Sequence, residues 1–254
     1  MKQTTIAVIN QKGGVGKTTT ATNLAAQLAT DQTTVLLIDL DPQGNATSGL
    51  GLAKEHLEPT SYDVLFGRNT LDQAVLASDR QGFFVLPANA HLAAAEVELV
   101  GMERREFVLR NALVNAAYDY IIIDCPPALG LLTINALTAA HAILIPVQSE
   151  YYALEGLGQL LGTVQRVKEA LNPGLDLLGV LLTMFDKRTS LSEQVQNELQ
   201  NHFGDKVFKT VIPRNVRLAE APSFGKTIFE HDRWSKGARA YKQFAKEVAK
   251  RVNG

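Results

Sequence analysis

The sequence has 254 residues, of which 46% are hydrophobic, and its formal net charge is −1 at pH 7. This length suits one domain, and no apolar run approaches the roughly 18 residues that a membrane-spanning helix needs. The single cysteine, Cys125, excludes an intrachain disulfide and a cysteine-ligated cluster within one chain. We therefore expect a single cytoplasmic domain over residues 1–254, in which Cys125 only packs.

Short apolar runs alternate with helical patterns along the chain. The runs predict buried strands at residues 5–10, 34–38, 83–86, 120–124, 142–147 and 177–183. The clearest helical patterns cover residues 18–29, 103–117, 156–171 and 190–203, and residues 44–81 indicate an irregular excursion of loops and helices. This alternation predicts an α/β fold with a mainly parallel, twisted sheet and helices on both faces. Ligands of such sheets bind at the carboxyl ends of the strands.

The first predicted strand runs into a glycine-rich loop and then a helix. The loop reads Gln11-Lys12-Gly13-Gly14-Val15-Gly16-Lys17-Thr18-Thr19. Its glycines let backbone N–H groups converge on phosphate oxygens, and the helix adds the positive end of its dipole. In such a loop Lys17 bridges the β- and γ-phosphates, and the Thr18 hydroxyl is a ligand of Mg²⁺. Residues 12–19 therefore predict a P-loop NTPase that binds ATP or ADP with Mg²⁺.

Aspartates follow two of the other predicted strands. Asp39 and Asp41 close the second strand, and their spacing of two residues points both toward the ligand edge. Beside a γ-phosphate, a carboxylate positions the attacking water or supports the metal shell, because direct contact would be repulsive. Asp124 closes the fourth strand and is expected to be an outer partner of Mg²⁺. A purely structural role in the turn is the alternative for Asp41.

The phosphate loop departs from the common G-x-x-x-x-G-K-[ST] pattern, because Gln11 stands at its first glycine and is followed by a second lysine. It resembles the deviant Walker A motif, K-G-G-x-G-K-T-T, of the ParA/MinD group of ATPases. The resemblance implies that Lys12 reaches across a dimer interface to the partner's nucleotide; a solvated loop lysine is the alternative. The segment from Asp39 resembles the family's D-x-D-P-Q-G-N switch, which implies that Asp41 orients the hydrolytic water and Asp39 assists the metal shell. The expected catalytic residues are Lys12, Lys17 and Asp41, and the expected metal residues are Thr18, Asp39 and Asp124.

Beyond these motifs, the sequence is similar over nearly its whole length to chromosome-partition ATPases of the ParA/Soj type. The similarity includes residues 146–156, 182–186 and 211–223. In that family the nucleotide base lies near the equivalents of Met184, Pro213 and Asn215, and an amide suits the edge of adenine. A helix N-cap is the alternative role for Asn215.

Charge is distributed unevenly along the chain. Residues 1–202 contain 13 Lys and Arg against 21 Asp and Glu, whereas residues 203–254 contain 12 against 5. The basic C-terminal part indicates a surface for a polyanion, with merely solvated helices as the alternative. The candidate DNA contacts are Lys187, Arg188, Arg214 and Arg217, with Lys226, Arg233, Lys236, Arg239, Lys242, Lys246 and Lys250 as helpers. The resemblance singles out Arg188 and Arg217. Because no aromatic interleaving or recognition helix argues for base readout, we expect salt-sensitive binding to double-stranded DNA without sequence preference.

ATP that pairs two subunits would double the phosphate contacts of one basic surface. We therefore expect an ATP-dependent homodimer that binds DNA on the nucleoid and dissociates after hydrolysis. The resemblance also implies a ParB-like partner protein, whose basic segment stimulates hydrolysis that is slow by itself.

A MinD-type, membrane-associated cell-division regulator is the main alternative. It would need a detachable amphipathic tail. The residues that form a stripe at helical spacing are Ala238, Tyr241, Phe244, Ala245, Val248 and Val252. This stripe is rich in alanine and favours docking against the body, so we expect no stable membrane association. A metabolic P-loop enzyme is a further class, but a ligase or kinase would need a small-molecule pocket that the sequence does not reveal.

Overall fold

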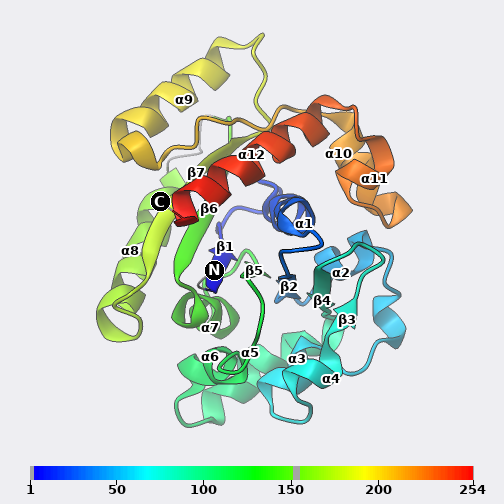
Figure 1. The fold of residues 1–254 in the computed structure, drawn as a ribbon. Helices are drawn as coiled ribbons and strands as arrows, with labels where there is room; N and C mark the ends of the chain where they lie inside the picture. The colour runs from blue at the N-terminus through cyan, green and yellow to red at the C-terminus, as the bar shows by residue number, and fades with distance from the viewer. Residues whose placement is uncertain (1–2, 151–154, 254) are drawn as a thin grey trace.

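The structure is a computed structural model and describes residues 3–150 and 155–253. Within them one sheet has seven strands in the order β3-β4-β2-β5-β1-β6-β7 (Figure 1). The strands are β1 (Thr4–Val8), β2 (Val35–Asp39), β3 (Leu76–Ala77), β4 (Phe83–Leu86), β5 (Tyr120–Asp124), β6 (Ala142–Gln148) and β7 (Asp176–Thr183). All neighbours are parallel except β3 and β4, which are antiparallel. The predicted mainly parallel α/β sheet is confirmed.

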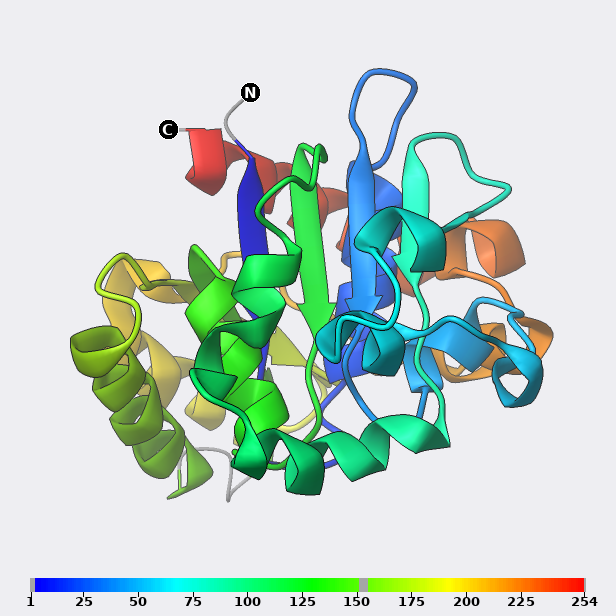
Figure 2. The same cartoon turned by 90° about the horizontal axis from the view of Figure 1, so that it is seen from below.

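Helices cover both faces of the sheet, which explains why its strands are apolar on both sides (Figure 2). On one face, Ile6 and Val8 pack in a cluster with α1 and the C-terminal helices, while on the other Ala7 and Ile9 pack with helices of the middle of the chain. The first group is α1 (Lys17–Leu28), α2 (Asn45–Gly49), α10 (Val216–Glu220), α11 (Ile228–Asp232) and α12 (Lys236–Asn253). The second is α3 (Ser61–Leu65), α4 (Leu71–Ala74), α5 (Ala95–Glu98), α6 (Val108–Ala112), α7 (Leu131–Ala139), α8 (Glu155–Ala170) and α9 (Ser190–Phe203). Cys125 is buried in this second cluster, as expected of a packing residue.

The helix predicted over residues 103–117 is wrong in its extent. A 3₁₀ segment covers Arg105–Phe107, and α6 covers only Val108–Ala112. Arg104 has a left-handed backbone (φ 53°), which breaks helical continuity. The Asn135 side chain, on α7, accepts from the N–H of Leu109 and donates to the carbonyl of Arg105, and so fixes where this segment turns. The sequence patterns also did not predict α7.

The C-terminal helix α12 packs across α1 with its apolar stripe buried (Figure 1). Tyr241 and Phe244 are 1% and 0% exposed, and the Tyr241 hydroxyl lies 3.1 Å from that of Thr20 on α1. The docking expected for this stripe is therefore observed. No helix among the described residues combines the length and the apolar character needed to cross a membrane.

Candidate functional site

The glycine-rich loop lies at the carboxyl end of β1 and leads directly into α1. Gly14 and Gly16 have φ of 74° and 90°, a left-handed backbone that other residues adopt only with strain. The Asn10 side chain anchors the loop, because its amide donates to the carbonyl of Pro146 on β6 (2.7 Å) and its carbonyl accepts from the N–H of Lys12 (3.0 Å). The loop is therefore held open between two neighbouring strands, as a phosphate cradle requires.

The two lysines of the loop have different surroundings. Lys17 is 7% exposed, and its ammonium folds back to donate to the carbonyl of Lys12 (3.1 Å). Burial lowers the pKa of Lys17, while the carboxylates of Asp124 and Asp41 oppose this shift. Lys12 is exposed, and its ammonium lies 3.0 Å from the Glu150 carboxylate. One lysine thus points into the cradle and the other away from it.

Asp39 is fully buried at the end of β2 and is committed to internal hydrogen bonds. One carboxylate oxygen accepts from the N–H and the hydroxyl of Thr47 (2.8 and 2.7 Å), and the other accepts from the N–H of Asp41 (3.2 Å). Burial raises the pKa of Asp39 to about 6, against the effect of these hydrogen bonds. Asp39 therefore fastens α2 to the sheet. Both of its carboxylate oxygens already accept hydrogen bonds, and its part in a metal shell stays a prediction.

Asp41 sits in the turn between β2 and α2 and is 7% exposed. Its carboxylate accepts from the N–H of Gln43 (2.9 Å), and its carbonyl accepts from Gly44 (2.8 Å). Gly44 has φ 59°, and a Cβ there would lie 2.8 Å from the carbonyl oxygen of Ala88. The turn thus needs glycine at this position, and it holds the Asp41 carboxylate beside Lys17, whose pKa the carboxylate raises.

Asp124 ends β5, which lies in the sheet between β2, the strand that Asp39 ends, and β1, the strand that precedes the P-loop. It is fully buried, and among the described residues neither of its carboxylate oxygens has a hydrogen-bond partner of good geometry, although the Thr18 side chain lies near enough to favour its charged form. Burial raises the pKa of Asp124 well above its ordinary value and Asp39 raises it further, while Thr18 and Lys17 oppose this. A buried, unpartnered carboxylate is costly unless a cation accompanies it, so the residues present fit Mg²⁺. No group of three or more His, Cys, Asp and Glu in the described ranges could hold a metal ion alone, so the nucleotide phosphates would have to complete its shell.

A pocket of about 330 Å³ opens between the P-loop and the segment that follows β7. Gly16 and Thr19 line one side, and Met184, Pro213 and Asn215 line the other. The structure thus brings together the three residues expected near the nucleotide base.

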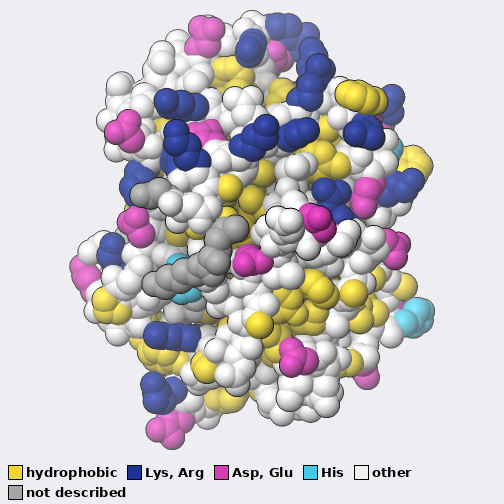
Figure 3. Space-filling view, in the orientation of Figure 1, with side chains coloured by type: hydrophobic (Ala, Val, Ile, Leu, Met, Phe, Trp, Pro, Cys, Tyr) yellow, Lys and Arg dark blue, Asp and Glu magenta, His cyan; other side chains and the backbone are white. Residues whose placement is uncertain are grey.

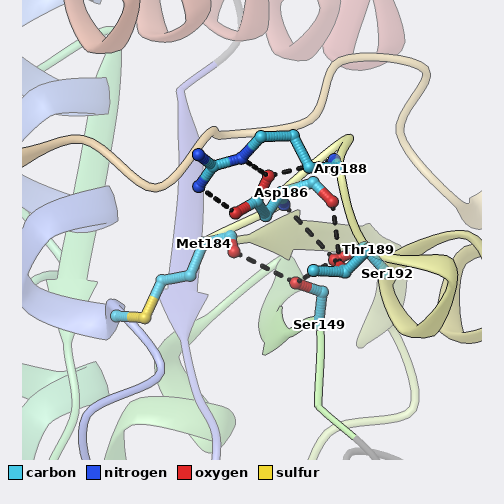
Figure 4. Close-up of polar contacts among 6 residues, drawn as sticks. All are labelled: Ser149, Met184, Asp186, Arg188, Thr189 and Ser192. Carbon is cyan, nitrogen blue, oxygen red and sulfur yellow. Dashed lines mark hydrogen bonds and ion pairs between the residues drawn. The ribbon is translucent and has the colours of Figure 1, made fainter.

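Two residues that line this pocket have an unusual backbone or an unsatisfied polar atom. Asn215 stands at the N-cap position of α10, yet its side chain makes no capping hydrogen bond, and its amide oxygen is buried without a partner among the described residues. The capping alternative is therefore not observed. Met184 has φ 52°, its carbonyl accepts from the Ser149 hydroxyl (3.1 Å), and its side chain points away from the polar cluster around Asp186 (Figure 4).

The candidate DNA contacts lie at two places on the surface. Arg188, 88% exposed in side-chain area, binds both oxygens of Asp186 (2.9 and 2.7 Å), which holds the pKa of Asp186 well below its usual range (Figure 4). Lys187 beside it is exposed. Arg217 on α10 is 56% exposed and lies 2.8 Å from Glu220. Exposed ion pairs contribute little stability, so these guanidinium groups can exchange carboxylates for phosphates.

Arg214 is exposed at the rim of the base pocket, on the same segment as Arg217. The basic side chains of α12 that were named as helpers are also exposed, because the helix buries only its apolar stripe. Figure 3 shows Lys and Arg gathered over α12 and the corner of α10 and α11, with few acidic side chains between them. These helices therefore present many basic side chains on the face of the molecule that Figure 3 shows.

Sequence reasoning missed two polar residues that support the site. Glu150 pairs with Lys12, and the Thr183 hydroxyl, at the end of β7, donates to the carbonyl of Val15 (2.8 Å). Both stand at or just beyond a strand's carboxyl end, which is the signal that could have found them. Residues 151–154 of the segment 146–156 lie outside the described residues.

A mainly parallel sheet with a P-loop after β1, and with carboxylates that close the neighbouring strand β5 and the next strand β2, defines a P-loop nucleotide-binding ATPase. A family model described as an AAA domain matches residues 3–177. The sequence is 57% identical over 246 residues to the sporulation initiation inhibitor protein Soj of Bacillus subtilis, covering 96% of this chain and 97% of that protein. It is 51% identical over 250 residues to the chromosome partitioning protein ParA of Caulobacter vibrioides, covering 97% and 94%. The chain belongs to the ParA/Soj family of chromosome-partitioning ATPases.

Solved structures share this fold over nearly the whole chain. Cobyrinic acid a,c-diamide synthase of Mycobacterium smegmatis, with bound ADP and magnesium, has a TM-score of 0.87 at 39% identity and covers 99% of this chain and 96% of that one. The septum site-determining protein MinD of Pyrococcus horikoshii, complexed with Mg-ADP, has a TM-score of 0.79 at 27% identity, with 99% and 98% covered. Identity to the Soj and ParA relatives is higher than to either.

Proposed function

We propose that this protein is an ATP-driven DNA-partition switch. Two copies pair around ATP, the pair binds double-stranded DNA without sequence preference, and hydrolysis releases it. The protein acts in the cytoplasm on the nucleoid, as one ATPase domain over residues 1–254, and a ParB-like partner protein stimulates its slow hydrolysis. The family membership supports the ATPase and the partition role, and the surface and the loop support the finer steps.

The different placement of the two loop lysines carries the proposal. Lys17 is 7% exposed and turns back over its own cradle, so it serves the nucleotide that its own chain binds. Lys12 is 42% exposed in side-chain area and faces outward, where its ammonium contacts the exposed carboxylate of Glu150. An outward ammonium on a phosphate loop can reach the phosphates held by a second copy once it leaves that carboxylate.

Within each copy, a few side chains prepare the nucleotide for hydrolysis. Lys17 neutralises charge on the β- and γ-phosphates, and Asp41 accepts a hydrogen bond from the attacking water and orients it. Thr18 and Asp124 would hold Mg²⁺, which neutralises charge on the phosphate oxygens when bound. Asp39 acts through Thr47, by keeping the segment that carries Asp41 rigid.

The base pocket supports adenine as the ligand. The buried amide oxygen of Asn215 can accept from the exocyclic amine of adenine, and Met184 and Pro213 provide apolar walls. A buried acceptor that gains a partner on binding discriminates against a base that presents another acceptor at that edge.

DNA affinity would then depend on ATP through valency. The slope of log affinity against log salt is about −0.9 per neutralised phosphate, so a pair that doubles the contacts doubles the slope. Arg188, Arg214 and Arg217 are exposed and can contribute these contacts.

The test measures binding to an arbitrary end-labelled duplex over a salt series, with a non-hydrolysable ATP analogue and with ADP, alongside sedimentation of the same samples. We expect a dimer and a steep salt slope with the analogue, and a monomer with a shallow slope with ADP. Arg217→Ala should reduce the slope, whereas Arg166→Ala, which removes an exposed arginine from α8, should not. Equal slopes in both nucleotide states, or a protein that stays monomeric with the analogue, would overturn the proposal.

A further inference from the structure

Two aromatic side chains lie exposed in the basic C-terminal part of the chain. Trp234, between α11 and α12, is 76% exposed, and Phe224, at the end of the 3₁₀ turn that precedes α11, is 63% exposed. Large aromatic side chains normally bury their apolar area, so two exposed rings in this part of the chain favour a contact surface.

Trp234 is tied to the candidate DNA contact Arg217. The carboxylate of Asp232 accepts a hydrogen bond from the backbone N–H of Trp234 (3.1 Å), and it also lies 3.7 Å from the guanidinium of Arg217. A single carboxylate therefore bridges the indole-bearing loop to α10.

Phe224 reaches the same arginine by another route. Glu220 pairs with Arg217 at 2.8 Å and lies 3.5 Å from the ring nitrogen of His231. The ring of His231 stacks on that of Phe224, with centroids 5.0 Å apart and planes 27° apart. In Figure 3 hydrophobic side chains bordered by Lys and Arg appear over this corner, where Figure 1 labels α10 and α11.

Basic side chains stand close to both rings. The Arg233 guanidinium lies over the indole of Trp234, 5.1 Å from its centroid, which leaves the other face of the ring exposed. Lys226 and Lys236, each two residues from one of the rings, are also exposed. Flat rings interleaved with cations are the chemistry that binds nucleic-acid bases and their flanking phosphates. A bilayer fits less well, because inserting the indole would draw Arg233 and the ion pairs of Asp232 out of water.

We propose that Trp234 and Phe224 stack on DNA bases whose own stacking is interrupted, while Arg217 and Arg233 bind the phosphates beside them. An intact duplex hides the faces of its bases except at ends and kinked steps, so this contact adds affinity only where bases are unstacked. The inference rests on the proposed DNA binding and adds to it a preference for DNA form without a preference for sequence.

Trp234 is the only tryptophan of the chain, so its fluorescence reports the contact directly. The full-length protein with a non-hydrolysable ATP analogue is titrated with an intact duplex and with the same duplex carrying a central run of mismatches. Binding is followed both by Trp234 fluorescence and by anisotropy of a label on the DNA. We expect the mismatched duplex to bind about fivefold more tightly or better and to quench the tryptophan more strongly.

Variants separate stacking from charge. Trp234→Ala should abolish the preference for the mismatched duplex and leave the salt slope unchanged, since no phosphate contact is lost, whereas Trp234→Phe should retain part of the preference. Phe224→Ala should weaken the preference while keeping the fluorescent reporter. Val97→Ala removes an equally exposed apolar side chain from α5 and should change nothing.

The outcomes distinguish this inference from the proposed function. Nucleotide-dependent DNA binding with equal affinity for the two duplexes and no quenching would overturn the stacking contact and leave the partition role intact. No binding to either duplex would overturn both. A blue shift of Trp234 on phosphatidylglycerol vesicles, without quenching by DNA, would replace the base contact with a membrane contact.

Discussion

The ammonium of Lys12, on the phosphate loop, lies 3.0 Å from the carboxylate of Glu150, just beyond the end of β6. The side chain of Gln148 donates to the other carboxylate oxygen of Glu150 (2.6 Å), which orients it toward the lysine. In the proposed dimer Lys12 serves the nucleotide of the second copy, so the Lys12–Glu150 ion pair competes with formation of the dimer. The lysine must exchange one anion for another each time the dimer forms.

Replacing Glu150 should therefore favour the dimer. Exposed ion pairs are worth up to about 1 kcal/mol, so Glu150→Gln should tighten ATP-dependent pairing by up to about fivefold. Sedimentation velocity with a non-hydrolysable analogue measures this, and Glu198→Gln, an exposed acid on α9, serves as the control. A weaker dimer in Glu150→Gln would show that the carboxylate contributes to the interface instead.

Loss of the Asp41 carboxylate should stop the cycle after pairing. Asp41→Ala removes the group that positions the water but none that holds phosphate, so hydrolysis should fall about a hundredfold or more while nucleotide binding remains. The protein should stay ATP-bound, dimeric and on DNA. Phosphate release and DNA retention are measured together, with Asp72→Ala, on the exposed side of α4, as the matched variant. Rapid turnover by Asp41→Ala would refute the assigned role.

The unliganded protein should become less stable as the pH rises, because of Asp124. Burial raises the pKa of this carboxyl in the folded state, so the stability it contributes is full below the unfolded value of 3.8 and is lost as the pH rises through the folded value. Asp39, whose pKa is raised from 3.8 to about 6, adds the same loss of stability as the pH rises between these two values. Asp124→Asn should gain thermal stability relative to wild type as the pH increases from 4.

Thermal melts over this pH range, without nucleotide or metal, measure the Asp124 effect. Asp31→Asn changes an exposed carboxylate and should show no such trend. Adding Mg²⁺ with ADP should stabilise wild type far more than Asp124→Asn, because the cation accompanies the buried charge. A difference between the two proteins that did not vary with pH would contradict the expected titration.

Removal of the Asn215 amide should relax the choice of base. Asn215→Ala should bind ATP roughly two- to tenfold more weakly, the range that one hydrogen bond accounts for, and should lose discrimination between ATP and GTP. Competition for a fluorescent nucleotide measures both affinities, and Asn201→Ala on the exposed side of α9 is the control. Unchanged discrimination would place the base elsewhere.

Much of the nucleotide site could be predicted because its determinants are local. The loop from Lys12 to Thr19 is contiguous, and its glycines, Lys17 and Thr18 follow a strand and begin a helix in the order that the chemistry requires. Asp39 and Asp124 were found because parallel strands place their carboxyl ends at one edge. What those carboxylates bond to could not be read from their positions. Asp39 accepts hydrogen bonds from Thr47 and from the N–H of Asp41, whereas Asp124 has no hydrogen-bond partner of good geometry within residues 3–150 and 155–253.

Elements whose conformation depends on contacts with distant residues could not be predicted from the sequence. The helical pattern of residues 103–117 is real, yet Arg104 and the side chain of Asn135 break it into shorter pieces. The apolar stripe of α12 predicted docking, but only the packed structure identifies α1 as its support.

The sequence by itself determined the α/β class, the phosphate loop and the buried faces, because these follow from residue order and from hydrophobic periods of two and 3.6 residues. Only the tertiary structure decided which side chains meet across the chain: Lys12 with Glu150, and Trp234 with Arg217 through Asp232. Trp234 and Phe224 are separated from Arg217 in the sequence, yet each is linked to it on the surface through other side chains. Such meetings are set by how helices and loops pack on the sheet, since residues far apart in the chain become neighbours only through that packing.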